Sequence, residues 1–371
     1  MQVSETEFER ELAWTRMHMP RLRRTLADLP DLRGVRLALS THLDIKMVPL
    51  LEGLPARGAQ LYVVTCNPQT VRDEVVRYLQ NAGAAVDAWH GMPADAYQQA
   101  IENALDWQPT HLCEMGADLT VALHRRPAFG SGVAASLEAT GSGITRLAGL
   151  VPHYPIFNWD DLPVKEGLHN RHMVGLTTWH MFFTRTRLTL HEKRVVIVGY
   201  GSVGRGLAGA ARAYGGTVCI VERDSGRALE ARYAGWDVQD LEDAIRSADV
   251  IVTATGAHGV IHAGHLPLLK EGVFLLNVGH RADEIDVAAL AAYPHRPVMP
   301  FVEEIDLGDR TVYLLAGGSM ANLTAGQGDS LNAFDLTLAV LTAGIGHIVG
   351  AGAQAPAGVH VLPRAVWERV L

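Results

Sequence analysis

The segment RVVIVGYGSVGRG, residues 194–206, constrains the fold of this chain more than any other stretch. An apolar run leads directly into three glycines with the spacing G-x-G-x-x-G, and a helical pattern follows them. The first glycine permits a tight turn, the second lets a pyrophosphate approach the backbone, and the third lets the helix pack closely on the strand. The motif predicts a Rossmann domain that binds a dinucleotide through Gly199, Gly201, Ser202, Val203 and Gly204.

A carboxylate at the end of the next expected strand supports this interpretation. Glu222, in the segment IVERD, has about the spacing of a residue that accepts hydrogen bonds from the adenosine ribose hydroxyls. An acid at this position favours NAD over NADP, and the neighbouring Arg223 weakens that preference. The alternative is a glycine-rich turn in an α/β domain that binds no dinucleotide.

Apolar segments alternate with helical segments along the whole chain, and a second series of them begins near residue 190. Such alternation is typical of parallel strands with crossover helices. We therefore expect an α/β fold of two doubly wound α/β domains. They are a substrate domain of residues 1–178, completed by residues 329–371, and a Rossmann NAD-binding domain of residues 179–328. The last long helix, which begins near residue 329, is expected to return to the substrate domain.

The composition excludes several classes of function. With 371 residues, 48% hydrophobic and 19% charged, the chain is long enough to bury two cores. A net charge of −8 without a block of Lys and Arg argues against nucleic-acid binding. The three cysteines are too widely separated for a disulfide framework or a metal site, which suits the reducing cytoplasm. We expect no signal peptide, because the N-terminal segment is charged, and no membrane span, because Asp335 and His347 interrupt the apolar run near residues 333–350.

Segments from both expected domains carry a specific resemblance. The segments CNP, GADLT, the glycine loop and NVGH followed by EID occur in the order typical of the S-adenosylhomocysteine hydrolase family. Matching segments run from MPRLRR near the start to GVHVLP near the end, so the chain resembles this family almost end to end. The resemblance implies tightly held NAD between two domains, a small-molecule nucleoside as substrate, and a homodimer or homotetramer.

The chemistry that the resemblance implies follows from acid strengths. A thioether at the 5′ carbon of a nucleoside leaves poorly, because no adjacent proton is acidic. Oxidation at the 3′ position gives a ketone that acidifies the 4′ proton, so a base can remove this proton and the 5′ group departs. In the hydrolases water then adds to the alkene, and the ketone is reduced again.

The resemblance assigns catalytic roles to individual residues. Lys165 matches the base for the 3′ hydroxyl, a role that needs its pKa lowered by burial or by neighbouring cations. Asn170 matches the residue that orients this lysine at the nicotinamide. His42 and His280 match two histidines at the 5′ side, and Asp118 matches the acid that ends an acidic loop.

Further positions match residues that line the cofactor or the substrate. Besides the glycine loop, Glu222 and Arg223, those placed at the cofactor are Thr140, Thr255, Gly256, Asn277 and Asn322. Those placed at the substrate are Asp44, Lys46, Cys66, Asn67, Glu114, Glu138 and Asp329. Cys66 is expected to line the cleft and not to act as a nucleophile, since the sequence shows no activating partner.

Several positions differ from the family pattern. Asp44 and Lys46 replace a small hydroxyl residue and an amide or acid in the segment that binds adenine. His169 stands where the family has an aspartate, and Asp329 stands where it has a histidine. An imidazole beside Lys165 would lower the pKa of the lysine or relay its proton, whereas an aspartate would raise it. We therefore count His169 among the catalytic residues.

These differences spare the redox and proton-transfer residues and alter substrate recognition. We expect first a nucleoside dehydratase of modified-nucleoside metabolism, which expels a 5′-side hydroxyl as water. One alternative is hydrolysis of S-adenosyl-L-homocysteine to adenosine and homocysteine, and another is a non-catalytic NAD-binding regulator of such a hydrolase. The sequence ends soon after GVHVLP, without the family's C-terminal tail, so we also expect NAD to be lost more readily on dialysis.

Overall fold

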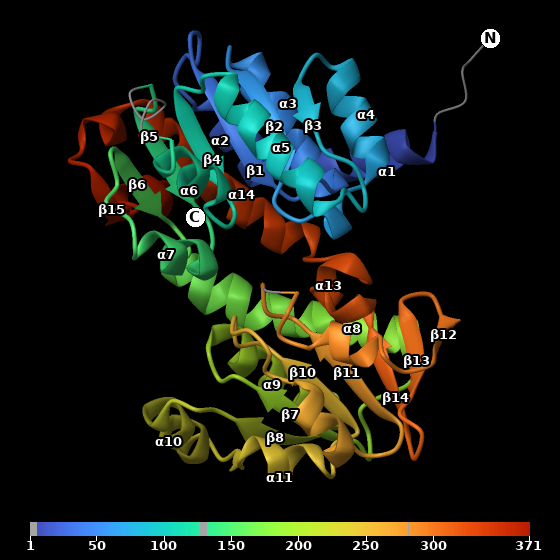
Figure 1. Ribbon diagram of the computed structural model, residues 1–371. Coiled ribbons are helices and arrows are strands. Elements are labelled where there is room, and N and C mark those ends of the chain that lie inside the picture. Colours follow the sequence, from blue (N-terminus) through green and yellow to red (C-terminus); the bar gives the residue numbers. More distant parts are fainter. Residues whose placement is uncertain (1–5, 127–131, 281) are drawn as a thin grey trace. The chain divides into compact units, whose positions relative to one another are not determined.

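The computed structural model describes residues 6–126, 132–280 and 282–371, and it divides them into two compact units (Figure 1). Unit 1 contains the chain up to Lys165 together with Leu331–Leu371, and unit 2 contains Glu166–Ser330. Each unit has an α/β architecture around a doubly wound sheet. The predicted fold class is therefore confirmed.

The sheet of unit 1 has seven strands among the described residues, all parallel, in the order β15-β6-β5-β4-β1-β2-β3. These strands are β1 (Arg36–Thr41), β2 (Gln60–Thr65), β3 (Ala85–Asp87), β4 (His111–Glu114), β5 (Ala135–Glu138), β6 (Pro155–Asn158) and β15 (Gly358–Val361). Leu37 and Leu39 contribute to one core and Ala38 to another, because successive side chains of a strand point to opposite faces. Both faces are covered by helices, which explains why the strands are almost continuously apolar.

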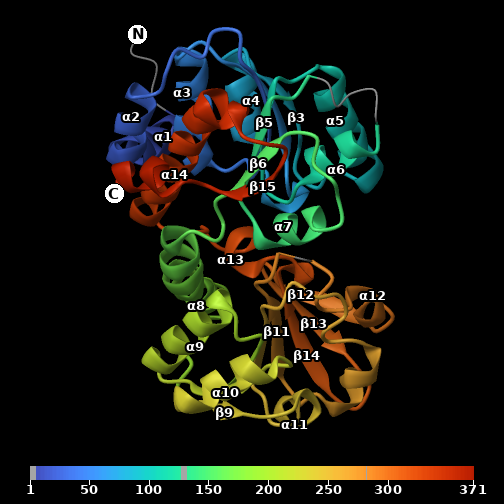
Figure 2. The same ribbon diagram turned by 90° about the vertical axis from the view of Figure 1, so that its left-hand side faces the viewer.

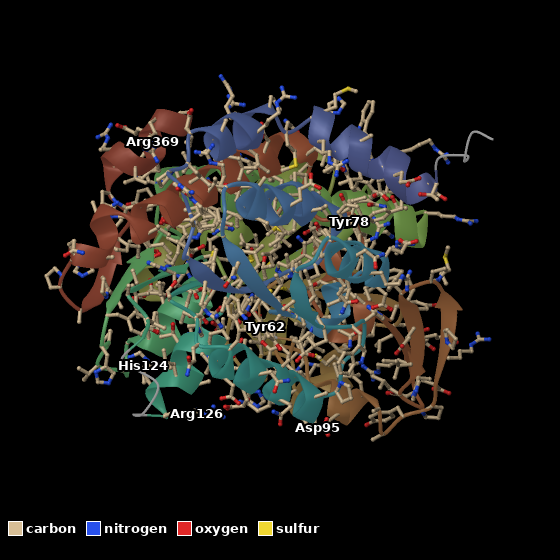
Figure 3. The ribbon with its side chains drawn as sticks, turned by 90° about the horizontal axis from the view of Figure 1, so that it is seen from above. Tyr62, Tyr78, Asp95, His124, Arg126 and Arg369 are labelled. Carbon is tan, nitrogen blue, oxygen red and sulfur yellow. The ribbon has the colours of Figure 1, made fainter. Side chains whose placement is uncertain are left out.

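Helices of unit 1 form two layers, one on each face of the sheet. The helices are α1 (Glu7–Met17), α2 (Pro20–Ala27), α3 (Val48–Ala56), α4 (Asp73–Asn81), α5 (Ala94–Asp106), α6 (Asp118–His124), α7 (Gly141–Leu147), α14 (Leu331–Val349) and α15 (Arg364–Trp367). Short 3₁₀ segments are η1 (Ile45–Met47), η2 (Pro68–Thr70), η7 (Ala351–Gln354) and η8 (Glu368–Val370). Arg126, which Figure 3 labels, follows α6 and pairs with Glu102 and Asp106 of α5.

Helix α14 lies alongside α2 in unit 1, although it follows the whole of unit 2 in the sequence (Figure 2). The carboxylate of Asp335 accepts hydrogen bonds from the backbone N–H groups of Arg21 and Leu22, at 3.1 and 2.8 Å. The first N–H groups of a helix have no partner within it, and here a carboxylate from α14 accepts hydrogen bonds from two of those in α2. This contact fixes the return of α14, which the sequence predicted.

One helix among the described residues, α14, is long and apolar enough to cross a membrane by length and composition alone. In this structure 61% of its apolar window is buried inside unit 1. The same composition is common in the core helices of globular domains.

The sheet of unit 2 has eight strands among the described residues, in the order β12-β13-β14-β11-β10-β7-β8-β9. They are β7 (Arg194–Val198), β8 (Thr217–Val221), β9 (Asp237–Val238), β10 (Val250–Thr253), β11 (Val273–Asn277), β12 (His295–Met299), β13 (Val302–Asp306) and β14 (Thr311–Leu315). Five apolar segments of the series that begins near residue 190 form parallel strands, β7, β8, β10, β11 and β14. The sequence missed β12 and β13, an antiparallel pair at the edge whose exposed residues lack a buried apolar pattern.

Helices of unit 2 cover both faces of its sheet. They are α8 (Val174–Thr186), α9 (Ser202–Ala213), α10 (Ser225–Tyr233), α11 (Leu241–Ile245), α12 (Val287–Leu290) and α13 (Ala321–Thr324), with 3₁₀ segments η5 (Ala263–Leu268) and η6 (Ala316–Gly318). A π-helical segment, η4 (Pro163–Met173), carries the chain from unit 1 into unit 2.

The change of unit falls at Lys165, earlier in the sequence than the expected boundary after residue 178. Contacts between α8 and α9 account for this difference. Trp179 donates from Nε1 to the carbonyl oxygen of Leu207 at 3.0 Å. A Cβ atom on Gly206 would lie 1.7 Å from the carbonyl oxygen of Arg171, so only glycine permits this close approach.

Candidate active site

The carboxyl ends of β1 and β4 form the switch point of the unit 1 sheet, because the chain continues outward from them in opposite directions. In doubly wound sheets, ligands bind at this edge. Many residues predicted to be catalytic or to contact the substrate lie at or just after the carboxyl ends of the strands. They are His42, Asp44 and Lys46 after β1, Cys66 and Asn67 after β2, Asp118 after β4, and Glu114 and Glu138 as the last residues of β4 and β5.

His42 is held by Thr70 of the neighbouring 3₁₀ segment. The ring Nδ1 lies 2.8 Å from the hydroxyl oxygen of Thr70, and this hydroxyl donates to the carbonyl oxygen of Asn67 at 2.8 Å. Since the hydroxyl has only one proton, its oxygen accepts from Nδ1–H. Nε2 is therefore the basic atom of the neutral ring, which suits a residue that transfers protons.

Cys66 follows β2 and remains a thiol. Burial, together with the negative charge of Asp118, raises the pKa of the Cys66 thiol well above its usual value. A nucleophilic cysteine needs the opposite shift. Cys66 is therefore suited to line the carboxyl edge of the sheet and not to act as a nucleophile.

Asp118 is oriented by two side chains from flanking helices. Tyr97 donates to Oδ2 at 2.8 Å, and Arg146 donates to Oδ1 at 2.7 Å and also to the carbonyl oxygen of Gly116. Burial of the phenol, together with the negative charge of Asp118, raises the pKa of Tyr97, so the phenol keeps the proton that it donates. Asp118 therefore has a fixed direction at the start of α6.

Glu114 and Glu138 lie opposite each other in the β4–β5 pair and are both buried. Glu138 accepts hydrogen bonds from the backbone N–H groups of Gly116, Ala117 and Thr140, at 2.8–3.0 Å. Glu114 accepts from the N–H groups of Leu119 and Thr120 and from the Thr120 hydroxyl. The two carboxylates thus hold the loop before α6. Both were predicted to contact the substrate, and the structure places them beneath the loop that carries Asp118.

Burial of these two neighbouring acids makes their charged forms costly. It raises the pKa of Glu114 to about 7, and burial with the charge of Glu114 raises the pKa of Glu138 to about 8. The hydroxyl of Thr140 donates to Glu138 at 2.7 Å and caps α7 by accepting from Gly143 N–H. Thr140, predicted at the cofactor, is a structural part of unit 1.

Lys165, the predicted base, lies where η4 leaves unit 1. Its ammonium nitrogen is 5.9 Å from the centre of the buried Trp159 ring, which follows β6. An indole face attracts a cation but adds no proton acceptor. Asn170 lies five residues further along η4 and belongs to unit 2.

The glycine loop of unit 2 has the geometry that a dinucleotide requires. Gly199 has a φ of +105°, and a Cβ atom on Gly204 would lie 1.9 Å from the carbonyl oxygen of Gly199. Gly201 differs, because its φ is −74° and the nearest neighbour of a Cβ atom would be 3.9 Å away. Neither conformation nor packing demands glycine at residue 201, so the space left there fits a pyrophosphate that approaches the N-terminus of α9.

Residues around this loop take defined places. Glu222 directly follows β8 and accepts from the N–H groups of Tyr200 and Asp224, at 2.7 and 2.9 Å, so the acid predicted at the ribose lies beside the loop. Ser202 begins α9 and donates to the Glu166 carboxylate at 2.7 Å. Val203 packs on the core of unit 2, and Arg223 is exposed.

The loops after β10 and β11 are joined by a buried acid that the sequence analysis missed. Glu284 accepts from the N–H groups of Thr255 and Gly256, at 2.9 and 2.7 Å, and from the Thr255 hydroxyl. Asn277, the last residue of β11, accepts from Thr253 Oγ1 at the end of β10 and from Gly279 N–H. His280 follows Asn277 by three residues. The segment EID contained the signal, but its acid was not recognised as a support for the cofactor loops.

Asn322 carries a buried polar atom that a ligand could satisfy. Its side chain is 2% exposed, and Oδ1 finds no hydrogen-bond donor among the residues that the structure describes. A buried acceptor without a donor is costly. The carboxamide N–H₂ of a nicotinamide would satisfy it, so the residues of unit 2 fit NAD at both its pyrophosphate and its nicotinamide.

The two positions that exchange residue types relative to the family contact each other. His169 Nε2 lies 3.0 Å from Asp329 Oδ2, and both side chains are less than a tenth exposed. The sequence analysis treated them as separate departures, one catalytic and one at the substrate. The structure instead joins them as a buried pair within unit 2, in which the same two residue types have changed places.

Other supporting residues were also missed by the sequence analysis. Thr70, Tyr97 and Arg146 carry no motif of their own and are recognisable only from their contacts with His42 and Asp118. Among the described residues no group of three or more His, Cys, Asp or Glu side chains could hold a metal ion.

The fold and these sites define an α/β protein of two units, one of which carries a dinucleotide-binding loop. Residues 2–142 match the family model of S-adenosyl-L-homocysteine hydrolase, and residues 183–328 match its NAD-binding domain. The chain belongs to the S-adenosyl-L-homocysteine hydrolase family, and it is an adenosylhomocysteinase-like enzyme that uses NAD.

Relatives from several archaea match almost the whole chain. S-inosyl-L-homocysteine hydrolase of Methanopyrus kandleri is 32% identical, covering 97% of this chain and 88% of that protein. Adenosylhomocysteinase of Thermococcus kodakarensis is 35% identical, with 98% and 89% covered, and that of Aeropyrum pernix is 34% identical, with 97% and 89% covered. Among solved structures, a dipicolinate synthase from Bacillus halodurans is similar, with 13% identity, a TM-score of 0.48, and 84% and 99% coverage.

Proposed function

We propose that this enzyme hydrolyses a 5′-thioether between a purine nucleoside and L-homocysteine. The observation that carries the proposal is the match to homocysteine thioether hydrolases over 97–98% of the chain, together with the retained residues at both sheet edges. Bound NAD would accept a hydride from the 3′ carbon and return it at the end of the cycle.

The residues of the chain supply the proton steps. Lys165 takes the 3′ hydroxyl proton as the ketone forms, and removal of the 4′ proton then lets the C5′–S bond break. We assign to His42, with Nε2 as its basic atom, and to His280 the proton exchange with the leaving sulfur and with the water that adds to the alkene. Asp118 keeps its direction through Tyr97 and Arg146. The products are the nucleoside and homocysteine.

The relatives support hydrolysis more than the dehydration that the sequence analysis preferred. Their names all specify a homocysteine thioether, and none of those reported above specifies loss of water. The altered residues that suggested dehydration include His169 and Asp329, which the structure joins into one pair. His169 and Asp329 therefore give less reason to infer dehydration than they gave as two separate departures.

Release of a thiol tests this proposal. NAD-loaded protein is incubated with S-adenosyl-L-homocysteine or S-inosyl-L-homocysteine, and free thiol and nucleoside are measured together. We expect equal amounts of both products. Lys165→Arg keeps the positive charge but is a far poorer base, and its kcat should fall by at least about 100-fold.

Lys270→Arg is the matched control, because Lys270 pairs with Asp249 at 2.6 Å in unit 2, away from the predicted site residues. It should keep the wild-type rate. Absence of thiol from both substrates, with NAD bound, would contradict hydrolysis. Formation of an alkene from a nucleoside that has a 5′-side hydroxyl would support dehydration. Absence of turnover with every nucleoside would support the alternative of a non-catalytic NAD-binding regulator.

A further inference from the structure

An acidic side chain lies at the N-terminal end of α9, where the glycine loop is suited to receive a pyrophosphate. Ser202, the first residue of α9, donates its hydroxyl hydrogen to Glu166 Oε1 at 2.7 Å. Both residues belong to unit 2, and Glu166 is exposed. The match of residues 183–328 to the family's NAD-binding domain includes the glycine loop but not Glu166. The contact of Glu166 with α9 is therefore a feature that the dinucleotide motif does not contain.

The N-terminus of a helix attracts negative charge. Its first N–H groups have no partner within the helix, and the helix dipole adds a partial positive charge there. A pyrophosphate uses this property in dinucleotide-binding domains, and a carboxylate beside the first turn uses it as well. Glu166 supplies such a carboxylate, because its hydrogen bond ties it to the first residue of α9. Two anions at one helix terminus repel each other, so Glu166 and a pyrophosphate would disfavour each other at this place.

A cation at the same loop supports this placement of the pyrophosphate. Arg227 Nη1 lies 3.9 Å from the point that a Cβ atom on Gly201 would occupy, so the guanidinium borders the space beside that glycine. The Arg227 side chain has no hydrogen-bond or ion-pair partner among the described residues; its backbone N–H donates to Asp224 Oδ1. A guanidinium binds phosphate oxygens well. Arg227 would therefore attract the same group that Glu166 repels.

We propose that Glu166 sets the affinity for NAD by competing with its pyrophosphate for the N-terminal end of α9. When the negatively charged pyrophosphate approaches Ser202, the Glu166 carboxylate either leaves this serine or stays at an electrostatic cost. Solvent screens part of the repulsion because the carboxylate is exposed, so Glu166 weakens the binding of NAD without preventing it. The expected consequence is a cofactor that exchanges with the solution more readily than it would without this acid.

The test is the dissociation constant of NAD, measured by isothermal titration calorimetry on protein freed of NAD, without substrate and at low ionic strength. Glu166→Gln keeps an oxygen that accepts from Ser202 but removes the charge, so NAD should bind at least about 5-fold more tightly. ADP-ribose, which has the same pyrophosphate but no nicotinamide, should gain the same factor. The control Glu303→Gln removes a partly exposed acid of β13, near the other edge of the sheet, and should leave both dissociation constants unchanged.

A second variant, Ser202→Ala, shows whether the competition takes place at α9. Without the serine hydroxyl the carboxylate is no longer tied to this helix, so Glu166→Gln should change the NAD affinity less in Ser202→Ala protein than in wild type. An equal change in both proteins would contradict competition at Ser202.

The outcomes with Glu166→Gln itself are equally decisive. Weaker or unchanged binding of NAD would overturn the proposal, because Glu166 would then support the cofactor or have no influence on it. A gain with NAD that is absent with ADP-ribose would also overturn it, because Glu166 would then act on the nicotinamide end. No thioether is present in these measurements, so their result does not depend on whether the proposed hydrolysis is correct.

Discussion

At the scale of single residues, the exchanged pair of His169 and Asp329 is the most informative feature. Considered in the sequence alone, each is an isolated departure from the family, and neither position signals the other. The contact at 3.0 Å shows that they form one buried unit. The pair anchors η4, the segment that also carries Lys165, the predicted base.

This pairing predicts non-additive effects of substitution. His169→Asp should leave two carboxylates facing each other, and Asp329→His two imidazoles, and each change should cost about 3–5 kcal/mol of unfolding free energy. The double variant, with the residues in the family's arrangement, should recover most of that loss and restore kcat. Thermal unfolding and steady-state kinetics of all four proteins measure the coupling. Additive losses in the double variant would show that the pair does not act as a unit.

At the scale of elements, the last residues of β4 and β5 hold the loop before α6. Their acids accept hydrogen bonds from seven backbone and hydroxyl donors of residues 116–120 and 140, and a Cβ atom on Gly143 would lie 2.3 Å from Glu138 Oε1. The sequence identified both glutamates as site residues. It could not show that they face a loop, because their donors are backbone N–H groups that leave no trace in residue type.

The raised pKa values of Glu114 and Glu138 predict how the stability of unit 1 depends on pH. Between about pH 4.5 and 8 the folded protein holds protons that the unfolded chain releases, so unfolding free energy falls as pH rises. The Tm should decrease by on the order of 5 °C from pH 6 to pH 9. Scanning calorimetry across this range measures the slope.

Two variants assign that slope to the buried pair. Glu114→Gln removes one of the coupled acids and should flatten the dependence on pH, although its amide donors fit the surrounding N–H groups poorly and should lower the Tm overall. Glu74→Gln changes an exposed acid of α4 and should keep the wild-type slope. A wild-type Tm that rises from pH 6 to pH 9 would contradict the predicted direction.

At the scale of the whole molecule, the sequence predicted the α/β fold, both doubly wound sheets and the return of α14 correctly, because strand runs, the glycine loop and the helix periodicity are local signals. The edge strands β12 and β13 were not predicted from the sequence, because they bury little apolar surface. The residues that orient the site residues were not predicted either. Thr70, Tyr97 and Glu284 act through contacts with residues 21 to 29 positions away, which only the fold brings together.

The central claim is that cleavage proceeds through oxidation at the 3′ carbon and loss of the 4′ proton. Deuterium at C4′ tests it most directly. NAD-loaded enzyme is incubated in heavy water with S-inosyl-L-homocysteine, and both recovered substrate and product nucleoside are examined by mass spectrometry and NMR. We predict deuterium at C4′ with wild-type enzyme and none with Lys165→Arg. Release of homocysteine with only protium at C4′ would contradict the account, because it would mean direct displacement of the thiol by water.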